Sequence, residues 1–277
     1  MSRVVILGAG ELGGALAYTL ARRDRVREVR LIDEAGSVAA GKALDIRQSG
    51  PIEGFTAEVT AASDISHVIS AGIVVLADRL AGGDWTAAML DRIAPLMPRV
   101  PLVCAGADHA RLVAHALDRK LLPRTRVLGS APEAAASAVR AVVALAANAS
   151  PDDVALSVAG LPPAGLIVGW SEATIGGTAI GRLLTPPILQ RLSGRVAQLW
   201  PPGPVALASA AAHVIEAIAT GSRRQATCLV GLDGEMGARS GVAAWPVRLG
   251  SRGVESLGVP ALSGHERTQL ENVLARS

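Results

Sequence analysis

The chain has 277 residues, of which 50% are hydrophobic and only 18% are charged. This composition supplies enough apolar material for a packed core and excludes an intrinsically disordered chain. The formal net charge is +3, and the basic residues are scattered instead of clustered, which argues against a nucleic-acid partner. No uninterrupted apolar run reaches about 18 residues, so we expect no membrane partner.

The N-terminus and the cysteines favour a cytoplasmic protein. Residues 1–8 enter an apolar strand pattern directly and lack the organisation of a signal peptide. Cys104 and Cys228 lie in apolar surroundings, and two cysteines are too few for a disulfide framework or a structural zinc site. We therefore expect a cytoplasmic globular protein without a metal.

The first half of the chain alternates between strand and helix patterns. Strands are predicted at Arg3–Gly8, Arg27–Asp33, Phe55–Thr60, Gly72–Ala77, Val100–Ala105 and Arg126–Gly129. Helices are predicted at Glu11–Arg23, Val38–Arg47, Thr86–Leu96 and Asp108–Leu117. Continuous apolar strands that alternate with helices are typical of a doubly wound parallel sheet with both faces covered. This pattern ends near residue 130.

The second half mixes helices and strands without that alternation. Helices are predicted at Ala131–Ala147, Ser209–Ala219 and Ser263–Arg276, and strands at Val154–Gly160, Thr227–Leu232 and Ala243–Leu249. His213 and Glu216 are expected on the polar side of the second helix. Ser263 is expected to cap the third, because Glu266 follows it by three residues. The fold class is therefore α/β, with the parallel sheet followed by a mixed α+β domain.

The segment Gly8-Ala9-Gly10-Glu11-Leu12-Gly13 is a GxGxxG motif. Glycine is frequent here, so the spacing alone is weakly specific, but the motif follows an apolar strand and opens a helix. Asp33 ends the next strand, 20 positions after Gly13. In a Rossmann-type domain this arrangement binds a dinucleotide: the glycines bring the backbone to the pyrophosphate, and the acidic residue binds the ribose hydroxyls. Residues 1–130 are therefore predicted to form an NAD-binding domain, with NAD preferred over NADP because Asp33 repels a 2′-phosphate. The remaining residues, 131–277, form the second domain.

With these residues in place, the chain resembles the lactate/malate dehydrogenase family over nearly its whole length. The similar segments are 41–45 with Gly50-Pro51, 74–77, 123–130, 233–237, 242–250 and 253–255. The resemblance implies a C-terminal substrate domain over residues 131–277 and an NAD cofactor held by Gly8–Gly13, Asp33 and Ala77. It also implies a small 2-oxo or 2-hydroxy compound as substrate and a homodimer or homotetramer.

The same resemblance implies that the family's catalytic positions are replaced. Pro162 stands where the family has its proton-transferring His, and Ala135 where it has the Asp that pairs with that His. Ala138 stands at the Arg that binds the substrate carboxylate, and Ala105 at the Asn near the nicotinamide. Losing the acid/base group alone costs about 10²–10⁴ in rate. The sequence therefore favours a catalytically impaired or dead homologue with a sensor or scaffold role.

Two alternatives remain open from the sequence. Arg79 or His109 could be recruited as substitute catalytic groups, which would give an active NAD-dependent oxidoreductase on a less polar substrate. His109 follows the fifth predicted strand, and the alternative to recruitment is a solvent-facing residue in the first turn of the following helix. The chain could also be an interaction protein that no longer binds NAD. Such a protein would be expected to lose the glycines of the loop, but they are all present.

Overall fold

The computed structural model describes residues 3–78, 87–238 and 241–275. The elements of the first half are β1 (Arg3–Leu7), α1 (Glu11–Arg23), β2 (Glu28–Ile32), α2 (Gly36–Glu53), β3 (Glu58–Ala62), the 3₁₀ helix η1 (Ile65–Ser70), β4 (Ile73–Leu76), α3 (Ala87–Ile93), η2 (Ala94–Leu96), β5 (Leu102–Cys104), α4 (Ala110–Asp118) and β6 (Val127–Gly129).

The second half contributes further helices and mostly short strands. They are α5 (Ala131–Ala147), η3 (Pro151–Asp153), β7 (Val154–Ala155), β8 (Val158–Leu161), β9 (Gly165–Val168), β10 (Thr174–Ile175), β11 (Thr178–Ala179), α6 (Ile180–Leu183), α7 (Pro186–Arg195), η4 (Val196–Leu199), α8 (Pro204–Thr220), β12 (Gln225–Leu232), η5 (Glu235–Gly237), β13 (Gly241–Gly250), β14 (Gly253–Leu257) and α9 (Gly264–Leu274).

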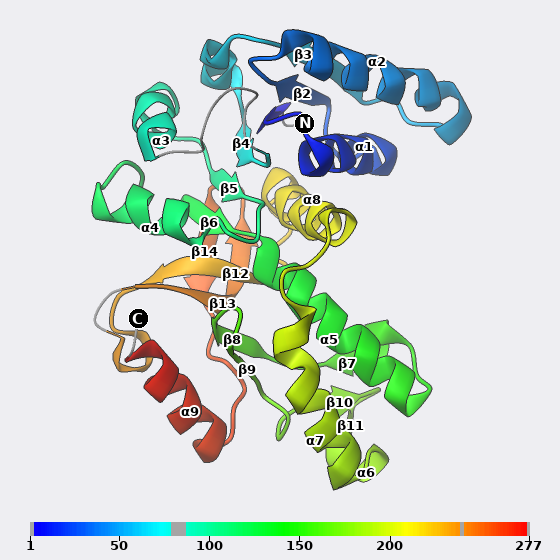
Figure 1. The fold of residues 1–277 in the computed structure, drawn as a ribbon, viewed down its shortest axis with the longest axis vertical. Helices are drawn as coiled ribbons and strands as arrows, with labels where there is room; N and C mark the ends of the chain where they lie inside the picture. The colour runs from blue at the N-terminus through cyan, green and yellow to red at the C-terminus, as the bar shows by residue number, and fades with distance from the viewer. Residues whose placement is uncertain (1–2, 79–86, 239–240, 276–277) are drawn as a thin grey trace.

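One large sheet runs through both halves (Figure 1). Its first six strands pair in parallel in the order β3-β2-β1-β4-β5-β6, the order of a doubly wound dinucleotide-binding fold. The sheet then continues through β12, β13, β8 and β9 with antiparallel pairing, and β14 pairs with β13. The strands β11, β10 and β7 form a separate small sheet. The α/β fold class is confirmed; the division into two domains at residue 130 stays a prediction.

Alternating strand residues explain why both faces of the parallel sheet are covered. On β1, Val4 and Ile6 belong to the apolar cluster formed with α1 and α8, whereas Val5 and Leu7 belong to the cluster formed with α3 and α4. The helix α8 comes from the second half of the chain yet packs along α1 (Figure 1). The first six strands are therefore covered partly by a helix that lies beyond residue 130.

Several predicted elements differ in the structure. Helix α2 continues six residues past its predicted end at Arg47, with Pro51 in its last turn, and ends where Gly54, with φ +79°, provides a left-handed C-cap. The predicted strand Val154–Gly160 is two strands, since β7 joins the small sheet and β8 the large one. Helix α8 begins five residues before the predicted Ser209, with Pro204 in its first turn.

The sequence placed Glu216 on the polar side of α8, but the structure buries it. Its side chain is buried and pairs with Arg23 at 3.3 Å and Arg25 at 3.9 Å, at the end of α1. Two arginines from the first half of the chain therefore meet a buried carboxylate from the second half, which the helical pattern of α8 cannot reveal.

The predicted cap of the last helix is confirmed. Ser263 and Glu266 form a reciprocal capping box, and Glu266 also accepts hydrogen bonds from the backbone N–H and hydroxyl of Ser171. Burial raises the pKa of Glu266, but the hydrogen bonds from Ser263 and Ser171 outweigh that effect, so its pKa lies below the ordinary 4.5. The ionised carboxylate therefore stabilises the folded state.

We expect Glu266→Gln to lower the free energy of unfolding by about 1–2 kcal/mol at pH 7. In the wild type Ser171 donates to one carboxylate oxygen and Ser263 to the other, whereas the Gln amide has only one acceptor oxygen. The pKa of Glu266 is lowered on folding, so its contribution is complete above about pH 4.5 and is lost as the pH falls through the folded-state pKa. Urea unfolding at pH 7 and pH 3.5 checks this. A difference between wild type and variant that stays constant across this range would contradict it.

Candidate functional site

The carboxyl edge of the parallel sheet forms a crevice between β1 and β4, where the strand order reverses. Ligands of doubly wound sheets bind at this point. The loops that follow β1, β4 and β5 meet here and enclose a cavity of about 270 Å³. The cavity is lined by Leu12, Ala77, Asp78, Gly106, Ala107, Asp108, His109, Arg111, Leu112 and Leu207. Leu207 belongs to α8, so the second half of the chain closes one side.

The glycine loop makes the close approaches that the motif requires. Gly8 has φ +93°, and a Cβ atom on it would lie 2.1 Å from the carbonyl oxygen of Asp78. A Cβ atom on Gly13 would lie 1.9 Å from the carbonyl oxygen of Gly8. Helix α1 therefore starts directly against the end of β1, and Gly10 precedes it without any side-chain cap of its own.

Asp33 lies at the end of β2, as the sequence predicts, and is 3% exposed. Its Oδ2 accepts a hydrogen bond from the backbone N–H of Ala9 at 2.9 Å, and its Oδ1 accepts one from Ala35 at 3.0 Å. The structure thus brings Asp33 into direct contact with the glycine loop. Of the other predicted cofactor residues, Ala9, Leu12 and Ala77 are buried there, while Glu11 is exposed.

Asp78, which the sequence analysis missed, occupies the start of α1. Its Oδ1 accepts a hydrogen bond from the N–H of Leu12 at 3.1 Å, and its Oδ2 accepts one from Gly13 at 2.5 Å. A signal for it existed: Asp78 directly follows β4, and in a doubly wound sheet that strand lies beside the strand of the glycine loop. An acidic residue at this position therefore lies near the loop, although the backbone groups that it contacts do not follow from the sequence.

The pKa of Asp78 lies above its ordinary value, chiefly because burial disfavours the charged form. The nearby Asp33 carboxylate raises it further. The hydrogen bonds from Gly13 and Leu12 and the positive charge of Lys42 oppose this effect without cancelling it. Asp78 is thus a carboxylate whose burial is only partly compensated by its partners.

His109 lines the same cavity but is not the solvent-facing residue that one reading of the sequence allowed. It is 5% exposed, and its Nδ1 accepts a hydrogen bond from the N–H of Gly106 at 3.0 Å. Burial lowers the pKa of His109 to about 4, against the opposing effect of Asp108. The ring is therefore neutral at pH 7 and carries its proton on Nε2, which lies 3.7 Å from an Asp108 carboxylate oxygen.

The positions that the resemblance assigns to the family's catalytic groups do not converge on a polar cluster. Ala105 (0% exposed) follows β5, and Ala135 (2% exposed) lies in an apolar cluster on α5. Ala138 is half-buried on the same helix. Pro162 is half-buried in the turn between β8 and β9. Arg79 lies outside the described residues.

Ser130 is a second polar residue at this edge that the sequence did not single out. It follows β6, its backbone N–H donates to the carbonyl of Cys104 at 3.0 Å, and its side chain is fully buried. Its hydroxyl has no hydrogen-bond partner among the described residues. A buried hydroxyl without a partner is costly, which makes Ser130 a candidate contact for a bound molecule.

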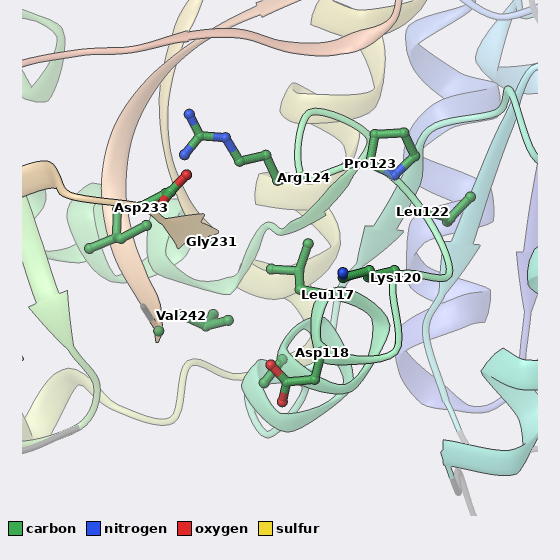
Figure 2. A pocket seen from close by; sticks show the side chains of 12 residues that line it. Leu117, Asp118, Lys120, Leu122, Pro123, Arg124, Gly231, Asp233 and Val242 are labelled. Carbon is green, nitrogen blue, oxygen red and sulfur yellow. The ribbon is translucent and has the colours of Figure 1, made fainter. Parts of the chain in front are cut away.

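A larger hollow, about 890 Å³, lies at the opposite edge of the sheet (Figure 2). The loop before β6, with Lys120, Pro123 and Arg124, lines one side, and Asp233 and Val242 line the other. Arg124 pairs with Glu235 at 3.4 Å. This hollow faces the amino end of β6, away from the glycine loop, and it contains none of the sequence-predicted site residues.

Neither a metal centre nor a single membrane-spanning helix is found within residues 3–78, 87–238 and 241–275. No group of three or more His, Cys, Asp or Glu side chains could hold a metal ion there. No single helix in these ranges is long and apolar enough to span a membrane; Pro186–Leu199 and Pro204–Thr220 pass that test only together and meet at a bend of 92°.

Two malate dehydrogenases match nearly the whole length of the chain. It is 28% identical to the malate dehydrogenase of Thioalkalivibrio sulfidiphilus over 297 aligned positions, covering 99% of this chain and 97% of that protein. It is 26% identical to the malate dehydrogenase of Dehalococcoides mccartyi (strain CBDB1), covering 98% of this chain and 95% of that one. No family model matches the sequence.

Solved structures agree in fold. A lactate dehydrogenase of Cryptosporidium parvum, in complex with lactic acid and nicotinamide adenine dinucleotide, superposes with a TM-score of 0.90 at 22% identity and covers 99% of this chain and 95% of its own. The malate dehydrogenase of Salinibacter ruber superposes with a TM-score of 0.88 at 24% identity, with 99% and 94% covered. The chain is therefore similar in sequence to malate dehydrogenases over nearly its whole length, and similar in fold to lactate and malate dehydrogenases.

Proposed function

We propose that this protein binds NAD at the carboxyl edge of its parallel sheet. The observation that carries the proposal is the contact between the glycine loop and Asp33, whose carboxylate accepts a hydrogen bond from Ala9 within that loop. Asp33 would accept hydrogen bonds from the adenosine ribose, and the N-terminus of α1 would face the pyrophosphate. When bound, NAD supplies a hydride acceptor, and NADH a hydride donor.

The buried hydroxyl of Ser130 at this edge supports the same cofactor. Ser130 follows β6 and carries a buried hydroxyl without a partner among the described residues. A ligand that extends along the carboxyl edge from the glycine loop toward β6 would reach it. The similarity to malate dehydrogenases and to a lactate dehydrogenase solved with this cofactor supports the choice of NAD.

The residues assigned to catalysis favour a weak or absent dehydrogenase reaction. Proton transfer needs a group that gains and loses a proton, and carboxylate binding needs an Arg. At the corresponding positions this chain has Pro162, Ala135, Ala138 and Ala105, of which Ala105 and Ala135 are almost completely buried. The proposed role is therefore that of an NAD-binding sensor or scaffold, assembled as a homo-oligomer in the cytoplasm.

An active oxidoreductase on a less polar 2-oxo or 2-hydroxy compound is the second candidate. It is favoured by His109, which lines the cavity beside Asp78, and by the enzyme names of the relatives. A neutral imidazole could accept a proton from a hydroxyl group. With a pKa of about 4, however, His109 has no second proton to donate at neutral pH.

Calorimetric titration with NADH and NADPH, followed by a turnover assay with oxaloacetate and pyruvate, tests both candidates. We expect NADH to bind and NADPH to bind at least tenfold more weakly. Ordinary enzymes have kcat/KM values of about 10⁴–10⁸ M⁻¹s⁻¹. Taking 10⁵ M⁻¹s⁻¹ as the reference, we expect kcat/KM for both substrates to be at least about a thousandfold lower. The loss of both an acid/base group and an Arg–carboxylate contact accounts for this difference.

Either half of this result can fail independently. Ordinary turnover of oxaloacetate or pyruvate would exclude the sensor or scaffold role. Turnover that His109→Ala abolishes without weakening NADH binding would establish the second candidate. Absence of binding by both dinucleotides would remove the cofactor from the proposal and would favour an interaction protein.

A further inference from the structure

The start of α1 already has an acceptor for its free N–H groups. The first turn of any helix leaves donors without partners inside the helix. In α1 the N–H of Gly14 bonds to Gly10, whereas those of Leu12 and Gly13 donate to the two oxygens of the Asp78 side chain. A residue from the β4 end thus caps α1, because Gly10 provides no side chain.

The Asp78 side chain also fills the space above the glycines. A Cβ atom on Gly10 would lie 2.6 Å from the Asp78 carboxyl carbon, and one on Gly13 would lie 3.1 Å from its Oδ2. These are the glycines whose missing side chains let a pyrophosphate approach the backbone in a dinucleotide-binding loop. A pyrophosphate and the Asp78 carboxylate therefore compete for the same donors and the same volume.

We propose that Asp78 is an internal competitor for the cofactor's pyrophosphate, and that it sets how tightly and how selectively this site binds a dinucleotide. The proposal rests on the proposed NAD function. Binding requires the Asp78 side chain to leave Leu12 and Gly13. Until it leaves, its negative charge repels the two charges of the incoming pyrophosphate. A ligand without a pyrophosphate does not meet this barrier.

The charged groups around Asp78 also support competition between its carboxylate and the pyrophosphate. Lys42 on α2 approaches the same end of α1, since its Nζ lies 2.9 Å from the position of a Cβ on Gly14. Asp33 adds negative charge from the end of β2. Asp108 and Arg111, which line the same cavity, pair with each other at 3.7 Å. When Asp78 leaves, Lys42 remains to face the pyrophosphate.

Three ligands and three variants test the proposal in the full-length protein. NADH and ADP-ribose contain the pyrophosphate, whereas adenosine does not. We expect Asp78→Ala to bind NADH and ADP-ribose at least tenfold more tightly than wild type and to bind adenosine equally. Asp78→Asn, which keeps one acceptor but no charge, should show an intermediate gain. Asp118→Asn removes a charge from an exposed residue at the opposite edge of the sheet without freeing the two N–H groups, and should change each affinity less than threefold.

Thermal unfolding provides a second test, because the effect of Asp78→Ala on stability should be unfavourable without ligand and should be offset by NADH. Without ligand, Asp78→Ala should melt below wild type, because Leu12 and Gly13 lose their acceptor. With saturating NADH, its melting temperature should rise more than that of wild type.

The outcomes separate the two proposals. Equal NADH affinity in wild type and Asp78→Ala, or weaker binding by the variant, would overturn the role of Asp78 and leave NAD binding intact. A gain of the same size for adenosine would show a general charge effect and would also overturn it. Absence of NADH binding in wild type and in folded Asp78→Ala and Asp78→Asn would refute the NAD function and, with it, the competition.

Discussion

Gly13→Ala is expected to lower the free energy of unfolding by about 2–3 kcal/mol and to weaken NADH binding at least a hundredfold. A Cβ atom at this position would lie 1.9 Å from the carbonyl oxygen of Gly8. The obstacle is backbone, so no side-chain rotation relieves it, and overpacking of this kind costs about 1–3 kcal/mol. The start of α1 must move away from the end of β1, which also displaces the donors that face the pyrophosphate.

Gly41→Ala is the matched control. Gly41 lies in α2 and is exposed, and a Cβ atom on it would have no neighbour within 4 Å. The same substitution should therefore stabilise the protein by about 0.5–1 kcal/mol, the usual advantage of Ala over Gly in a helix. Urea unfolding and NADH titration of both variants measure the difference. Equal stabilities of the two variants would show that α1 and β1 are not in close backbone contact at Gly13.

Trp245→Ala is expected to destabilise the protein by about 3–5 kcal/mol, the usual cost of truncating a buried aromatic side chain. Trp245 is 2% exposed on β13, the strand that pairs with β12, β8 and β14. Its indole Nε1 donates to the carbonyl of Gly258 at 2.8 Å. The variant leaves a cavity in the core cluster that joins the sheet to α8, and it leaves that carbonyl without its donor.

Trp245→Phe separates the two effects. It keeps an aromatic ring but loses the hydrogen bond, so we expect a smaller loss of about 1–2 kcal/mol. Val259→Ala, at a residue that is 82% exposed, should change stability by less than about 0.5 kcal/mol. Denaturant unfolding monitored by far-UV circular dichroism gives all three values. A Trp245→Ala loss no larger than that of Trp245→Phe would contradict tight packing around this ring.

Local patterns predicted some elements closely and others poorly. The bounds of α1 and α5 are as predicted, because each helix has an apolar repeat between clear end signals, such as Pro132 at the start of α5 and Asn148, with φ +51°, at its end. The strands β9, β10, β11 and β14 were not predicted. The strands β10 and β11 have two residues each, which is too few for a period to be recognised. In the structure β9 and β14 pair with the strand directly before them, and β10 pairs with β11 directly after it.

The sequence by itself determined the parallel half of the fold, the glycine loop and the place of Asp33. These features leave local patterns in the sequence: apolar strands that alternate with helices, a turn that needs glycine, and a helix that packs back on the strand. The full-length resemblance to lactate/malate dehydrogenases also needed only the sequence.

Only the tertiary structure decided what meets the glycine loop. Asp78 reaches Leu12 and Gly13 across 65 to 66 positions of sequence, and α8 covers α1 from the other half of the chain. Burial, which lowers the pKa of His109 and raises that of Asp78, is a property of the assembled crevice. Long-range pairing and desolvation leave no periodic pattern in a sequence, because they depend on which distant surfaces come together when the chain folds.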